Sequence, residues 1–66
     1  MTILAQRLTE AMAAGEMGVY QLSKKAGIAK STIYGVLVRD SIPSAFTLAC
    51  LADALGVTMD WLWGRK

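Results

Sequence analysis

The sequence predicts an all-α fold of five short helices, and three observations lead to that fold class. Apolar residues recur three and four positions apart along most of the chain, which is the spacing of one face of a helix. No segment convincingly alternates apolar and polar residues as a half-buried strand does. Six glycines and one proline divide the chain into pieces that suit short helices and tight turns. We expect residues 1–66 to form a single compact domain.

Three helices are expected in the first half of the chain. The first begins after Thr2, whose hydroxyl can cap it, and ends at Gly15. The second covers about residues 19–26, and Gly27 interrupts it. The third covers about residues 30–38, and the side that packs inward carries Ile33, Val36 and Leu37.

Two further helices are expected after a loop at residues 39–43, because the residue before a proline rarely continues a helix. Ser44 can cap the fourth helix and Gly56 can end it. Thr58 can cap a last short helix at residues 59–63. The apolar stripe of the fourth helix consists of Leu48, Leu51, Ala52 and Leu55.

Composition excludes several classes of protein. Hydrophobic residues make up 55% of the chain, too many for a disordered tail, yet no apolar run is long enough to span a membrane. The first residues lack the pattern of a signal peptide, so a cytoplasmic protein is expected. The chain has no histidine, and its one cysteine, Cys50, is expected to be a small core residue. We therefore expect no enzymatic activity, metal, cofactor or small-molecule substrate.

Positive charge is concentrated in one segment. Residues 19–39 contain four basic residues and no acidic one, a charge of +4, whereas the rest of the chain has three basic and five acidic residues, a charge of −2. This asymmetry suggests a polyanionic partner on one face. The alternative is four solvated surface charges. The basic residues of the segment are Lys24, Lys25, Lys30 and Arg39.

Residues 19–38 have the spacing of a helix-turn-helix. Leu22 and the small Ala26 can pack the first helix inward, so that the second helix crosses it closely. Gly27 stands where the turn needs a left-handed backbone, and Ile28 can plug the turn into the core. In this motif the second helix lies in the DNA major groove, and its N-terminal residues meet base edges.

Residues 22–34, LSKKAGIAKSTIY, resemble the helix-turn-helix core of the lambda-repressor/Cro-like (XRE-type) DNA-binding domains. Residues 51–58, LADALGVT, resemble a later helix of the same family, and the similarity covers nearly the whole chain. The resemblance implies a five-helix transcriptional regulator, a repressor or a Cro-like protein. Such a protein binds double-stranded operator DNA, usually as a homodimer, inside a prokaryotic cell.

The chain departs from the family pattern at several positions. The family usually begins its second helix with a glutamine that holds a phosphate, and here that residue is Val19. The recognition helix lacks the usual Ser or Thr cap, because Ala29 stands there; a lost cap costs about 1 kcal/mol. An arginine–glutamate pair of the family is replaced by Met12 and Leu37, which we expect to meet in the core.

The exposed face of the third helix supplies the candidates for reading bases. Lys30 can donate to guanine or to a phosphate, and the Thr32 methyl can meet thymine. Tyr34 can contact a phosphate or pack on a sugar, and Gly35 would let the backbone approach DNA. The alternatives are a solvated Lys30, a plain surface aromatic at Tyr34 and a tolerated helix defect at Gly35. The set is Lys30, Ser31, Thr32, Tyr34 and Gly35.

Three residues are candidates for binding the DNA backbone. Arg39 follows the third helix and can clamp a phosphate. Ser44 and the free amides at the start of the fourth helix can hold another, although simple capping also explains Ser44. Lys25 is expected to add general attraction rather than a specific contact.

The last residues suggest how two copies pair. Trp61 and Trp63 lie two positions apart and cannot share one helix face. Trp61 matches a core position of the family, so Leu62 and Trp63 are the candidates for a homodimer interface. The alternative is that both tryptophans pack under the first helix. A second functional hypothesis is a protein-interaction module, antitoxin-like or adaptor, that docks through residues 36–38 and 61–63.

Overall fold

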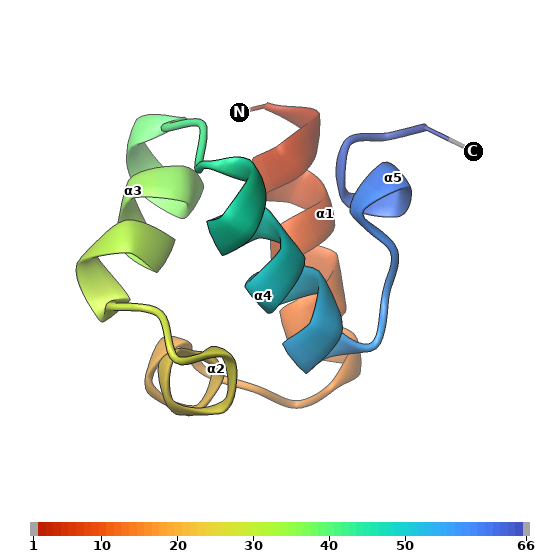
Figure 1. Ribbon diagram of the computed structural model, residues 1–66. Helices are drawn as coiled ribbons and strands as arrows, with labels where there is room; N and C mark the ends of the chain where they lie inside the picture. The colour runs from red at the N-terminus through yellow and green to blue at the C-terminus, as the bar shows by residue number, and fades with distance from the viewer. Residues whose placement is uncertain (1, 66) are drawn as a thin grey trace.

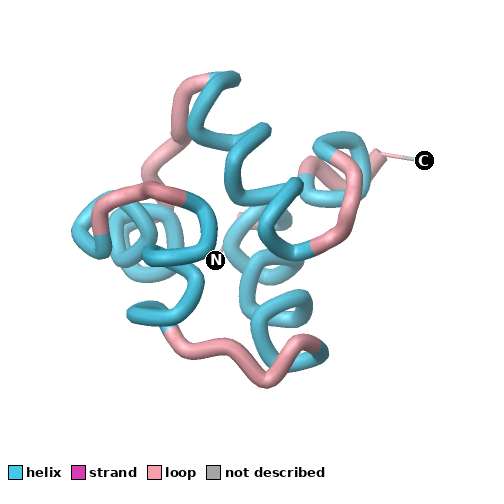
Figure 2. Tube along the Cα trace, turned by 60° about the horizontal axis from the view of Figure 1, so that its bottom comes forward, coloured by secondary structure: helices cyan, strands magenta, loops and turns pink. Residues whose placement is uncertain are grey.

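The computed structural model describes residues 2–65, which form five α-helices and no strand (Figure 1, Figure 2). The predicted all-α class is confirmed. Each helix begins where the sequence predicts, within a residue, because local caps and turns define the ends. The third helix runs one residue further than expected. The helices are α1 Ile3–Ala14, α2 Val19–Ala26, α3 Lys30–Arg39, α4 Ala45–Leu55 and α5 Met59–Leu62.

The helices are arranged so that the outer side of the α2–α3 pair is free. In Figure 1, α3 lies on one side of α1 and α4, and α5 lies on the opposite side. α1 packs against both α3 and α5, whereas α2 packs against α3 and α4. The face of α3 that points away from α1 and α2 is therefore open to a partner.

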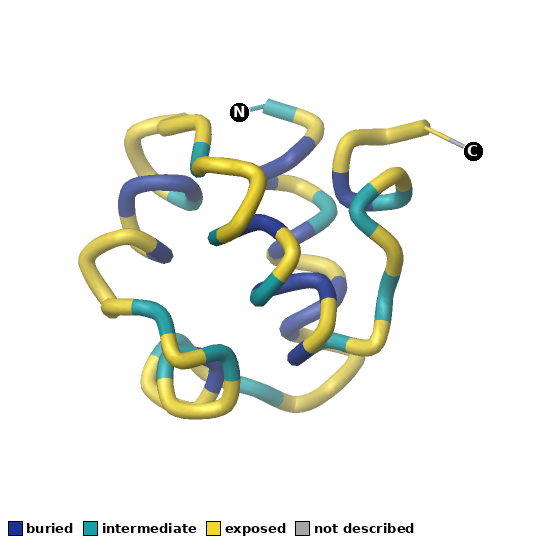
Figure 3. The backbone as a smooth tube through the Cα atoms, viewed as in Figure 1, coloured by how far each residue is buried: buried dark blue, intermediate teal, exposed yellow. Residues whose placement is uncertain are grey.

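One hydrophobic cluster holds all five helices together. Figure 3 shows that the buried parts of the helices face the interior. Met12 is buried in this cluster and Leu37 is partly buried against it, so both residues of the expected pair take apolar positions at the core. The largest fully buried side chains are Leu4, Leu8, Leu22, Ile33, Val36, Leu48, Leu51 and Leu62.

The predicted helix caps are confirmed. A hydroxyl oxygen accepts a hydrogen bond from the backbone N–H three residues later at Thr2 (3.0 Å), Ser44 (3.2 Å) and Thr58 (3.0 Å). Ala29 gives α3 no side-chain cap, as expected from its methyl group. Gly56 ends α4 in the left-handed conformation, with φ of 70°.

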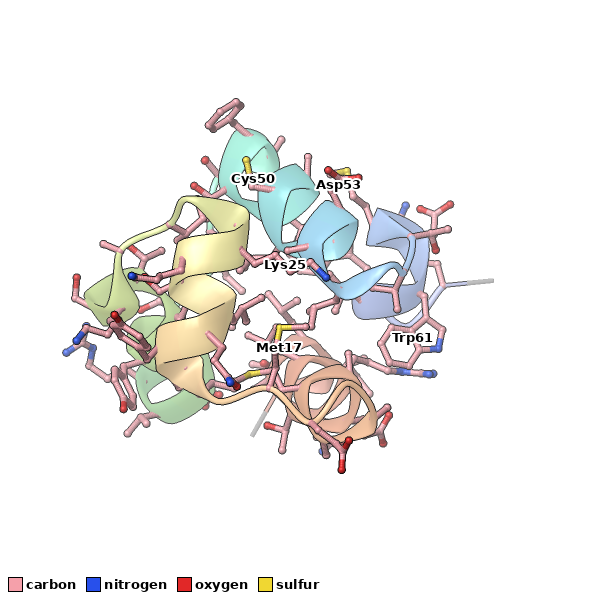
Figure 4. The ribbon with its side chains drawn as sticks, turned by 90° about the horizontal axis from the view of Figure 1, so that it is seen from below. Met17, Lys25, Cys50, Asp53 and Trp61 are labelled. Carbon is pink, nitrogen blue, oxygen red and sulfur yellow. The ribbon has the colours of Figure 1, made fainter. Side chains whose placement is uncertain are left out.

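Two expectations about burial are wrong. Leu62 is completely buried, because α5 lies against α1 and α4 on the side that carries this residue. Its neighbour Trp63 remains 38% exposed. Cys50 is only half-buried and lies outside the core cluster, and Figure 4 shows its side chain on the outer side of α4.

Each end of the described chain contacts another part of the fold. Thr2, the first described residue, bonds to the residue that follows α3, and the turn near the C-terminus lies against the first residue of α1. The Thr2 N–H donates to Oδ1 of Asp40, 38 positions away, at 3.2 Å. Gly64, with φ of 79°, lies so close to Ile3 that a Cβ added to the glycine would stand 2.6 Å from Ile3 Cγ2. Thr2 and Ile3 therefore join the start of α1 to the residue after α3 and to the turn that follows α5.

Candidate nucleic-acid interface

The turn between α2 and α3 is fixed by glycine, a core contact and one serine. Gly27 adopts the predicted left-handed conformation, with φ of 71°, and its N–H donates to the Ser23 carbonyl at 2.9 Å. Ile28 is partly buried against the core cluster. The Ser23 hydroxyl donates to the Ile28 carbonyl at 2.6 Å. These contacts set the angle at which α3 leaves α2 and so orient its outer face.

The start of α2 is held in place without the glutamine that the family usually has there. Val19 is partly buried against the core cluster, so it anchors the helix by apolar contact. The neighbouring Gln21 accepts a hydrogen bond at Oε1 from the Gly18 N–H, at 3.0 Å. Gln21 therefore supports the first turn of α2.

The outer face of α3 presents most of the residues predicted to read bases. Ile33 and Val36 are 0% and 1% exposed and seat the helix on the core. Tyr34 is 51% exposed and Val38 is 73% exposed on the other side. The predicted residues found exposed are Lys30, Ser31, Thr32 and Tyr34.

The expected exposure of Gly35 is wrong, because the chain folds back over it. Asp40 ends α3 in the left-handed conformation, with φ of 54°, and the Ser41 N–H then donates to the Gly35 carbonyl at 3.0 Å. A Cβ at Gly35 would lie 3.3 Å from Arg39 Nη2 and 3.4 Å from Ser41 Oγ. The missing side chain makes room for these two polar groups.

A shallow pocket of about 300 Å³ brings several predicted residues together. Ser31, Thr32 and Arg39 line it from α3, and residues 41–43 line it from the loop that precedes Ser44. Lys25 does not join this group, since Figure 4 shows its side chain directed from α2 towards the side of α4, away from α3.

Tyr20 is a feature of this surface that the sequence analysis missed. It is 57% exposed, and the Lys24 and Lys30 Nζ atoms lie 5.1 Å and 5.5 Å from its ring centroid. The four-residue spacing of Tyr20 and Lys24 on α2 is the one sequence signal for this cluster. Lys30 reaches the ring across the turn, which no local pattern indicates.

The docking surface predicted for a protein-interaction module is mostly not exposed. Val36 and Leu62 are buried, and Leu37 and Trp61 are partly buried. Trp61 instead carries the Arg7 guanidinium over its ring, 4.7 Å from the centroid, and Figure 4 shows it beside α1. Of the six predicted docking residues, only Val38 and Trp63 are exposed, and the two lie on α3 and after α5, on opposite sides of the molecule.

A short helix, a glycine turn and a second helix with exposed hydroxyl and amino groups define the class of a helix-turn-helix domain. Residues 5–66 match the family model described as the bacteriophage CI repressor helix-turn-helix domain, and the chain belongs to this family. It is therefore a DNA-binding domain of a transcriptional regulator, as the resemblance implied, and its family is not a family of enzymes.

No curated protein and no solved structure gives a significant match to the chain. Among the helices of residues 2–65, none has both the length and the apolar character needed to cross a membrane. The same residues contain no cluster of three or more histidine, cysteine or acidic side chains suited to a metal ion.

Proposed function

We propose that the chain, acting as one domain over residues 1–66, is a sequence-specific repressor or Cro-like regulator of transcription in the cytoplasm. In this proposal α3 enters the major groove of a palindromic operator, and two copies bind the two half-sites. The observation that carries the proposal is the exposed polar face of α3, held by the glycine turn within a segment of charge +4. No cofactor is required.

The side chains along α3 are proposed to read base edges. Lys30 leads the helix and can donate to O6 or N7 of guanine. Ser31 and Thr32 lie in the next positions and can bond to a base, while the Thr32 methyl suits the methyl group of thymine. Tyr34, one turn further along, is exposed and reaches a base, a sugar or a phosphate.

Arg39 and Ser44 are proposed to hold phosphates on either side of the pocket at the end of α3. The Arg39 guanidinium lies over Gly35, next to the residues that would enter the groove. The Ser44 hydroxyl caps α4, whose first N–H groups favour an anion. Lys25 points elsewhere and is proposed to contribute only long-range attraction.

Substitutions separate base reading from backbone binding. Lys30→Ala and Thr32→Ala should each change the preferred sequence, by roughly 1–3 kcal/mol where the lost contact is to a base. Arg39→Ala should weaken binding to all sequences about equally. Lys25→Ala is the matched control, because it removes the same charge from a side chain directed away from α3. Selection from a randomised duplex pool, followed by titration, measures both effects.

Two outcomes of these titrations would contradict the proposal. If Arg39→Ala changes the preferred sequence while Lys30→Ala and Thr32→Ala leave it unaltered, α3 is placed wrongly in the groove. Binding should also weaken steeply with added salt, because the basic residues release counterions from DNA. An affinity that stays constant over a several-fold rise in salt would argue against DNA as the partner.

Trp63 and the start of α1 are proposed to form the dimer contact, in place of the buried Leu62. Trp63 is 38% exposed, and Ile3, which lies against the adjacent Gly64, is 52% exposed. Covering the exposed part of a tryptophan side chain of roughly 200 Å² would contribute about 2 kcal/mol, before the cost of ordering. This value suits a weak dimer that forms fully on DNA, with half-sites roughly 34 Å apart.

Sedimentation of the wild-type protein and Trp63→Ser, with and without a palindromic duplex, tests this interface. The wild type should bind the two half-sites cooperatively, and the variant should lose the cooperativity. Independent binding of one copy to each half-site by both proteins would exclude this dimer contact.

A further inference from the structure

We propose that Tyr20 is a positioning residue for Lys30, which begins the recognition helix. The inference deepens the proposed function and rests on it, since it concerns how α3 meets DNA. Tyr20 lies in the first turn of α2, Lys24 lies one turn later, and Lys30 is the first residue of α3. The ammonium groups of Lys24 and Lys30 both approach the Tyr20 ring, to 5.1 Å and 5.5 Å from its centroid.

The core does not explain the presence of this ring. Tyr20 is 57% exposed and is not part of the hydrophobic cluster that holds the helices together. An aromatic face attracts a cation within about 6 Å, and both lysines meet that distance. The Tyr20 ring therefore makes its contacts at the protein surface, where it binds Lys24 of α2 and Lys30, the first residue of α3.

Lys30 is placed where a positive charge is otherwise unfavourable. It stands at the positive end of the α3 dipole, the first turn of α3 contains no acidic residue, and Ala29 gives no capping oxygen. The negative face of the Tyr20 ring offsets this cost. It also limits the rotamers of a flexible side chain, so that less entropy is lost when Lys30 binds.

The two lysines at one ring favour an anionic ligand. Both ammonium groups lie on the same small ring, so they are about a Debye length apart or closer and repel each other. A DNA phosphate beside Tyr20 would relieve that repulsion, while the ring keeps Lys30 aimed at the leading edge of α3. Tyr20 thus links phosphate attraction on α2 to base reading on α3.

The position of the lysines can be measured in the protein without DNA. In proton NMR, the ring current of Tyr20 should move the ε-methylene signals of Lys24 and Lys30 upfield. Tyr20→Phe should keep the shift and Tyr20→Leu should abolish it. Tyr34→Leu is the matched control, since it removes a tyrosine of similar exposure (51%), whereas both lysines lie over Tyr20. Unshifted lysine signals in the wild type would overturn the inference.

The consequence for DNA is tested with a duplex that the wild-type protein selects from a randomised pool. Tyr20→Leu should weaken binding about two- to fivefold, the range for an exposed cation–π contact, while Tyr20→Phe should bind like the wild type. In a protein that already carries Lys30→Met, Tyr20→Leu should reduce DNA affinity by at most half as much, because the side chain that the ring positions is gone.

Each other result of that titration is also decisive. An equal effect of Tyr20→Leu in both backgrounds overturns the coupling to Lys30. Binding of Tyr20→Phe as weak as that of Tyr20→Leu assigns the effect to the hydroxyl and overturns it too. Failure of the wild type to select any duplex is a failure of the proposed function itself, and it is recognised before any variant is compared.

Discussion

Replacing Gly35 by alanine should make the protein more stable and a weaker DNA binder. Alanine is better than glycine inside a helix by about 1 kcal/mol. The added Cβ would lie 3.3 Å from Arg39 Nη2 and 3.4 Å from Ser41 Oγ, which is close but involves only the ends of rotatable side chains. Since both can move by a few tenths of an ångström, we expect a net gain of about 0.5–1 kcal/mol in the free energy of unfolding.

The same methyl group should displace the Arg39 guanidinium from the pocket beside α3. If Arg39 holds a phosphate, the loss should resemble that of one hydrogen bond to a charged group, about 1.5–3 kcal/mol, and should be similar for all DNA sequences. The loss should not exceed that of Arg39→Ala. In Gly35→Ala with Arg39→Ala, the methyl group should cause no further loss of DNA affinity.

Thermal and urea unfolding of these variants, with parallel DNA titrations, measure both effects. A gain of 1 kcal/mol raises the melting temperature by roughly 4–8 °C in a domain of this size. The double variant is the control for crowding, because it removes the nearest neighbour of the new Cβ. If Gly35→Ala lowers the stability and the double variant does not recover it, Ser41 and the backbone do not yield, and the reasoning fails.

Substitutions at Leu62 and Gly64 test the packing of the C-terminal turn. Leu62→Ala should lower the free energy of unfolding by roughly 2–5 kcal/mol, because it empties a fully buried site. Val38→Ala, at a residue that is 73% exposed, should change stability by much less, and similar urea midpoints for the two would contradict the assigned burial. Gly64→Ala should destabilise by about 1 kcal/mol or more, since φ is 79° and the new Cβ would stand 2.6 Å from Ile3 Cγ2; an unchanged melting temperature would show that this turn is not held against α1.

The helix boundaries could be predicted because local chemistry determines them. Each of Thr2, Ser44 and Thr58 satisfies a backbone N–H three residues later, so the residue type alone marks the start of a helix. Gly27 and Gly56 adopt positive φ at the ends of α2 and α4, where other residues would be strained. The helix-turn-helix follows from these signals together with the apolar spacing.

The burial of Leu62 could not be predicted in the same way. A helix of four residues completes hardly more than one turn, so no apolar residue recurs to indicate which side faces inward. Contacts with α1 and α4 decide the rotation of α5, and these contacts join residues far apart in the sequence. Both Leu62 and Trp63 are apolar, so residue type alone does not distinguish them, whereas tertiary packing buries Leu62 and leaves Trp63 38% exposed.

The chain reversal at the end of α3 could not be predicted, because Asp40 rather than a glycine makes it and because Asp40 bonds to a residue far away in the sequence. Chains usually leave a helix in the left-handed conformation at a glycine, yet here Asp40 does so, with φ of 54°. Its carboxylate accepts a hydrogen bond from the Thr2 N–H, which helps to hold the strained residue in place. That reversal brings Ser41 over Gly35 and buries a position that the helical period alone leaves exposed. The pocket beside the recognition helix thus depends on a chain reversal at Asp40 that no glycine marks, which explains why the sequence revealed the candidate residues but not their arrangement.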